Sequence, residues 1–84
     1  AVPEPLQAVT RATLPITAIR KEQHGVSLVL QANALEDNLI VLRAAATPKT
    51  ISAAGRPMVW KVNDGLIRIE LGKLVGDAEL RMEF

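Results

Sequence analysis

The sequence predicts an all-β domain, a small antiparallel β-sandwich of about six or seven strands. Apolar and polar residues alternate along successive segments, which is the spacing of strands with one buried face. Turn-forming residues recur between these segments about every 8–14 residues, the rhythm of sandwiches and barrels. No window sustains the spacings of three and four residues that an amphipathic helix requires.

The alternation is clearest in the last predicted strand, residues 78–84, where Leu80 and Met82 lie opposite Arg81. Similar alternation predicts strands at residues 16–20, 26–32, 40–44, 58–62 and 67–71. The centre of the core is expected to consist of the larger inward residues, namely Leu28, Leu30, Leu42, Trp60, Ile67, Ile69, Leu80 and Met82.

Two dipeptides mark turns between these predicted strands. Asp64-Gly65 lies between two alternating segments and predicts a hairpin turn, because glycine accepts a positive φ without a steric penalty. His24-Gly25 separates the first two predicted strands. Pro15 has no N–H for a ladder, so the first predicted strand should lie at a sheet edge or begin after it.

The chain of 84 residues has room for one domain. Residues 1–12 contain Val2-Pro3-Glu4-Pro5 and are expected to form a linker or extended lead-in, so that the sandwich covers residues 13–84. The chain starts at Ala1 without a leader, which suggests a processed protein or a piece of a longer one. A single helical turn over residues 34–37, capped by Asn33, is a further expectation.

Composition argues against several classes of function. The net charge is +1 and the basic residues are scattered among acidic ones, so no nucleic-acid footprint is visible. The chain has no cysteine, which excludes disulfides and thiolate metal sites. No apolar run approaches the roughly 20 residues of a membrane helix, so membrane insertion is not expected.

Catalytic groups do not form a recognisable set. His24 is the single histidine and precedes a glycine at a predicted turn, where an exposed turn residue is expected. Glu70, Glu79 and Glu83 lie on outward strand sides among arginines, so cross-strand ion pairing explains them. Neither Ser27 nor Ser52 lies in a nucleophile-elbow sequence. We therefore expect no enzyme activity and no cofactor.

Two pairs of acidic residues are candidates for a calcium site. Glu36 and Asp37 are adjacent, while Asp64 and Asp77 each follow a strand. Calcium takes about six to eight oxygen ligands, and these residues lack the density of a dedicated calcium loop. No metal site is expected.

Four apolar residues fall on strand sides that should face water: Val29, Leu39, Val41 and Leu66. Contact with a neighbouring domain of the parent chain or another protein is expected either through an exposed strand edge, whose backbone groups can pair with an added strand, or through these four residues, which predict a weak interaction surface. Two alternatives stay open, namely that Leu6, Val9 and Leu14 fold back over them or that they are scattered single residues. Trp60 shares the inward side with Met58 and Val62, which favours packing over a role as a sugar-stacking platform.

Residues 51–71 follow the pattern strand, Gly55-Arg56-Pro57, strand, Asp64-Gly65, strand. This pattern resembles the closing strands of immunoglobulin-like β-sandwich modules attached to bacterial secreted enzymes, especially glycoside hydrolases. The resemblance covers roughly residues 26–84 and carries no functional residues to transfer.

The resemblance implies a non-catalytic accessory or interaction module of a larger, extracytoplasmic bacterial protein, periplasmic or secreted, such as a carbohydrate-active enzyme. One alternative is a protein-binding module of a periplasmic envelope or secretion assembly. The other is a carbohydrate-binding module, which is less favoured because sugar sites use several exposed rings and the aromatic residues here are Trp60 and Phe84. An exposed Trp60 beside polar groups would favour the sugar-binding alternative.

Overall fold

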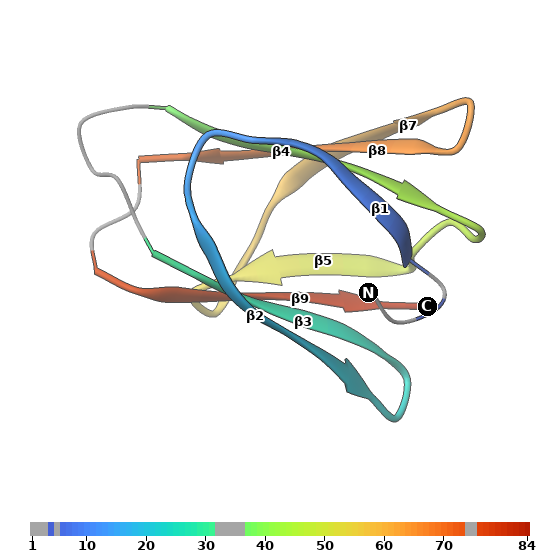
Figure 1. Ribbon diagram of the computed structural model, residues 1–84, viewed down its shortest axis with the longest axis horizontal. Helices are drawn as coiled ribbons and strands as arrows, with labels where there is room; N and C mark the ends of the chain where they lie inside the picture. Colours follow the sequence, from blue (N-terminus) through green and yellow to red (C-terminus); the bar gives the residue numbers. More distant parts are fainter. Residues whose placement is uncertain (1–3, 5, 32–36, 74–75) are drawn as a thin grey trace.

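The computed structural model describes residues 4, 6–31, 37–73 and 76–84, and the elements in these ranges are all strands. The strands form two antiparallel sheets that lie face to face around one core (Figure 1). The prediction of an all-β, sandwich-like architecture is confirmed. Within these ranges, no helix is long and apolar enough to cross a membrane.

One sheet has four strands in the order β1-β4-β8-β7, which are β1 (Leu6–Ala12), β4 (Asn38–Ala44), β8 (Leu66–Gly72) and β7 (Val59–Asn63). The other has five strands in the order β2-β3-β9-β5-β6, which are β2 (Ile16–Glu22), β3 (Gly25–Leu30), β9 (Ala78–Glu83), β5 (Thr50–Ala53) and β6 (Arg56–Pro57). The described strand segments therefore number nine, against the six or seven expected.

The core lies between the sheets and is almost wholly aliphatic. Seven of its eight expected central residues are at most 1% exposed: Leu28, Leu30, Leu42, Ile67, Ile69, Leu80 and Met82. Trp60, the eighth, is half-buried and packs against the edge of this core. Its strand, β7, is at the edge of its sheet, so Trp60 is flanked by a paired strand, β8, on one side only.

Residues 6–12, expected as a lead-in outside the sandwich, form its first strand. β1 pairs with β4, and Leu6 is only 2% exposed in the core. Two register shifts, between Leu6 and Ala8 and between Val9 and Arg11, interrupt the ladder. Each shift breaks the alternation of side chains, which is why the sequence pattern did not reveal this strand.

The predicted strands at residues 26–32 and 40–44 follow each other in the sequence, but they do not pair with each other. β3 pairs with β2 and β9, whereas β4 pairs with β1 and β8 in the other sheet. Alternation reports which side of a strand is buried and not which sheet the strand joins, because both sheets face the same core. The expected helical turn capped by Asn33 falls largely outside the described residues.

The hairpin predicted at Asp64-Gly65 is confirmed. The two residues have φ values of 51° and 78°, which are the left-handed values of a type I′ turn between β7 and β8. Pro15 also has the expected effect, because β2 begins at the following residue and lies at the edge of its sheet.

We expect Leu80→Ala to reduce the free energy of unfolding by about 2–5 kcal/mol, because it removes a fully buried side chain. Arg81→Ala is the matched control on the same strand, since its side chain is 63% exposed and should contribute about 0–1 kcal/mol. Urea denaturation of both variants measures the two losses. Equal losses would show that the inward and outward sides of β9 have been assigned incorrectly.

Candidate functional site

The outer face of the four-stranded sheet collects three of the four apolar residues that were expected to form a surface. Leu39 and Val41 on β4 and Leu66 on β8 are half-buried there. Val29 lies on β3, on the outer face of the other sheet, so it does not join them. Leu39 and Val41 are neighbours on the outer side of β4, and Leu66 lies diagonally from Val41, paired with Arg43; we call these three residues of one face the apolar patch (Leu39, Val41 and Leu66).

Leu6, Val9 and Leu14, the alternative cover for this patch, point elsewhere. Leu6 and Leu14 are 2% and 3% exposed within the core, and Val9 packs against the core from β1. The folded-back arrangement considered from the sequence is therefore wrong for these three residues.

Three basic side chains cross the same face in one line of paired residues, and Arg43 lies in the neighbouring line, beside Leu66. Arg11 on β1 lies beside Val41, Val41 beside Arg68, and Arg68 beside Lys61 on β7. We call this line the basic row (Arg11, Val41, Arg68 and Lys61). Lys61 and Arg68 come from the two strands of one hairpin, whereas Arg11 comes from the distant strand β1 and joins them only through the registers of β1 with β4 and of β4 with β8.

Acidic groups compensate this row only in part. The guanidinium of Arg68 lies 4.0 Å from the carboxylate of Glu70, and both side chains are more than half exposed. No described carboxylate lies within ion-pair distance of Lys61. A hollow of about 410 Å³ opens beside the patch, lined by Asp37, Asn38, Leu39, Arg68, Glu70 and Gly72.

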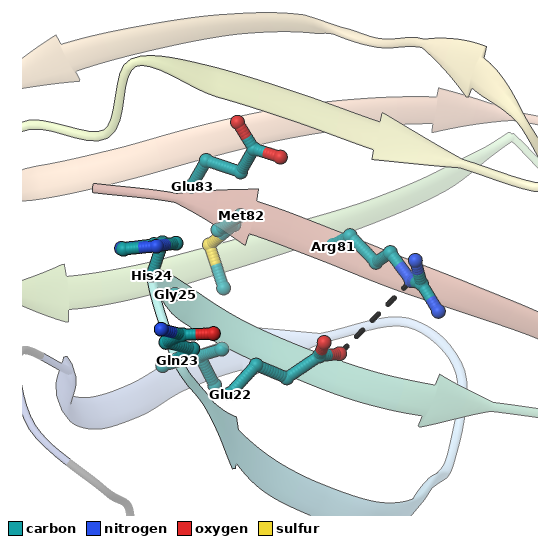
Figure 2. A pocket seen from close by; sticks show the side chains of 8 residues that line it. Glu22, Gln23, His24, Gly25, Arg81, Met82 and Glu83 are labelled. Atoms are coloured by element: carbon teal, nitrogen blue, oxygen red, sulfur yellow. Dashed lines mark ion pairs between the residues drawn. The ribbon is translucent and has the colours of Figure 1, made fainter.

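A second region with titratable groups lies where the β2–β3 hairpin meets the end of β9 (Figure 2). Its hollow measures about 170 Å³ and is lined by Glu22, Gln23, His24, Gly25, Val26, Arg81, Met82 and Glu83. Ligand pockets usually measure about 300–1,000 Å³, so this one is small.

Arg81 organises the charges of this hollow. Its Nε–H donates a hydrogen bond to the carboxylate of Glu79, and the same nitrogen lies 4.0 Å from the carboxylate of Glu22. The bond to Glu79 and the negative charges of Glu79 and Glu22 raise the pKa of Arg81 above its ordinary value. A guanidinium is charged at physiological pH in any case, and the two carboxylates serve as its ion-pair partners.

The remaining candidates for chemistry lie apart. His24 is exposed at the β2–β3 turn, and Figure 2 shows it away from the pair formed by Arg81 and Glu22. Asp64 and Asp77 are exposed in separate loops, and Glu36 lies outside the described residues. Within the described ranges, no three His, Cys, Asp or Glu side chains lie close enough together to hold a metal ion.

Trp60 points inward from β7, where it is paired with Ile69 and packs against the core. This is the inward side predicted from the sequence. The outward neighbours of Trp60 on β7 are Val59 and Lys61, so its ring does not lie among polar groups on the outer face.

Comparison with known proteins returned no matching family model, no matching curated protein and no matching solved structure.

We expect Gly25→Ala to cost at least about 2 kcal/mol of unfolding free energy, because packing an extra methyl into a filled site typically costs 1–3 kcal/mol. An added Cβ would lie 1.8 Å from the carbonyl oxygen of Met82 on β9, so the two strands would have to separate. Gly55→Ala is the control, since nothing lies within 4 Å of its added Cβ and its positive φ alone should cost about 1 kcal/mol. If urea denaturation gives equal losses, β3 and β9 do not approach as closely as described.

Proposed function

We propose that this chain is a non-catalytic contact module, an accessory or interaction domain of a larger extracytoplasmic bacterial protein. The apolar patch on the outer face of the four-stranded sheet is the observation that carries the proposal. An antiparallel sheet with one face in water normally has polar residues on that face, whereas Leu39, Val41 and Leu66 are aliphatic. Apolar residues surrounded by polar ones, with arginine among them, are typical of protein interfaces.

The immunoglobulin-like resemblance supports the kind of parent protein, such as a secreted carbohydrate-active enzyme. It rests on the local strand and turn pattern of residues 51–71, in which the type I′ hairpin is present. In the immunoglobulin order the last strand lies at a sheet edge, whereas β9 lies between β3 and β5. The resemblance therefore supports an extracytoplasmic parent protein, while the strand order of the five-stranded sheet differs from the immunoglobulin order.

A binding module of a periplasmic envelope or secretion assembly would use the same outer face, and the full reading frame with its neighbouring genes separates the two. A carbohydrate-binding module has less support, because the half-buried Trp60 faces the core. Sugar platforms present the flat side of a ring to solvent.

We expect a photo-crosslinking amino acid at position 41, replacing Val41, to crosslink the protein to its neighbour in cells of the source organism. The same amino acid at position 29 is the matched control, since Val29 is also half-buried but lies on the opposite outer face. The readout is a discrete heavier band on an immunoblot, formed after irradiation at position 41 and not at position 29.

Crosslinking that is absent at position 41, or equal at both positions, would contradict the proposed contact face. Thermal unfolding of each labelled protein controls for folding, and both should unfold at temperatures close to that of the unmodified protein.

A further inference from the structure

Four strands lie at the edges of the two sheets, and three of them are either interrupted by register shifts or very short. β1 has two register shifts, β2 has one, and β6 has two residues including Pro57. β7 differs, because all five of its residues pair with β8 without a shift. Bulges, prolines, short length and charged side chains, especially lysine, are the usual means by which proteins keep an edge from pairing with another chain. The edge of β7 lacks the first three and carries one lysine, Lys61, whose charge a partner strand would have to match.

The side chains of β7 point to the same conclusion. Val59 is 63% exposed and Val62 is 40% exposed, and they are the exposed large hydrophobic residues of the described chain. They lie on opposite sides of one strand, Val59 toward the outer face and Val62 toward the core side. Both sides of β7 therefore offer apolar surface at the edge of the sheet.

The hairpin turn determines which backbone groups of β7 face the open edge. In a two-residue hairpin the residues that flank the turn form the first hydrogen-bonded pair, and the pairs then alternate. Asn63 and Leu66 flank this turn, so Lys61 forms hydrogen bonds with Arg68 on β8. The N–H and C=O groups of Trp60 and Val62 are directed away from β8, where no described strand pairs with them.

An added strand would extend each line of paired residues by one position. Its residue opposite Lys61 would join the basic row, whose cations Arg68 and Lys61 already lie side by side. Opposite charges directly across two strands stabilise a sheet, and like charges destabilise it. The neighbouring positions would pack beside Trp60 and Val62 on the core side, which favours apolar residues.

We infer that the β7 edge binds an extended segment of a partner protein with the local pattern apolar, acidic, apolar, by strand addition. This inference deepens the proposed contact function by naming the mode of contact and the chemistry of the partner. Pairing of two copies through β7 is disfavoured, because a two-fold pairing centred on the strand would place Lys61 opposite Lys61 and bring two basic rows together. Nucleic acid is disfavoured because none of the outer-face residues of β7 and β4 has an aromatic ring for base stacking, although Lys61 and Arg43 among them are basic.

The test uses a capped peptide, Ser-Thr-Val-Glu-Val-Thr-Ser, titrated into the isotope-labelled 84-residue chain and followed by NMR. We expect chemical-shift changes centred on β7 and β8. Amide hydrogen exchange at Trp60 and Val62 should slow about tenfold at 90% occupancy, because exchange then proceeds from the free fraction. The same peptide with lysine in place of glutamate should bind about three- to tenfold more weakly.

Lys61→Glu should reverse the preference between the two peptides. Arg20→Glu is the matched control, since it reverses an exposed charge on the edge strand β2 of the other sheet and should leave the preference unchanged. Thermal unfolding of both variants verifies that they remain folded.

The inference is overturned if the glutamate peptide causes no change at Trp60 and Val62, if its changes map to another edge, or if both peptides bind equally. Tighter binding of single-stranded DNA at the same amides, or a peptide-independent dimer in analytical ultracentrifugation, would also overturn it. Crosslinking at position 41 is measured independently of peptide binding at β7. The proposed contact function and the inference about the β7 edge can therefore be contradicted separately.

Discussion

The five-stranded sheet depends on β9, the last strand of the chain. β9 pairs with β3 over six residues on one side and with β5 over four on the other. It is therefore the link between the β2–β3 hairpin and the β5–β6 hairpin, which do not pair with each other. Its inward side chains, Ala78, Leu80 and Met82, lie in the middle of the core. Without this strand the sheet would separate into two hairpins, and a single hairpin is marginally stable in water.

Small residues on the neighbouring strand let β9 take this position. Gly25 on β3 has no side chain where the backbone of Met82 passes, and Ser27 is paired with Arg81 and only 1% exposed although it lies on the outer side. Arg81 and Glu22 meet within ion-pair distance from strands on either side of β3. The ion pairs of this region are thus a consequence of close strand packing, and the region needs no catalytic role to explain its charges.

The two sides of the four-stranded sheet carry different kinds of residues. Its inner side supplies Ile40, Leu42, Ile67 and Ile69 to the core, each at most 1% exposed. Its outer side carries the apolar patch and the basic row. At one edge of the sheet, β7 pairs with β8 without a register shift. Residues that stabilise the fold and residues available for contact therefore alternate along β4 and β8. A substitution on the outer side should therefore have little effect on the core.

The sequence predicted the features that depend on local pattern. Alternation identified the inward side chains of β3, β4, β8 and β9, and the demand for positive φ identified the turn at Gly65. Features that depend on pairing between distant segments were missed. Bulges concealed β1, and the sheet that each strand joins is not encoded in its own alternation. Within the basic row, the pairing of Lys61 with Arg68 follows from the predicted hairpin turn, whereas Arg11 joins them only through the registers of β1 with β4 and of β4 with β8.

Native-state hydrogen exchange at increasing denaturant concentration tests most directly whether β9 holds the sandwich together. Amides at the centre of a cooperative fold exchange through global unfolding, whereas edge amides exchange through local openings of lower free energy. We expect the amides that link β9 to β3 to exchange with the free energy of global unfolding, and the Arg56 amide of β6 and the amides at the open side of β7 to exchange with less. If the β9 amides instead exchange by local opening while β7 stays protected, the central claim is contradicted.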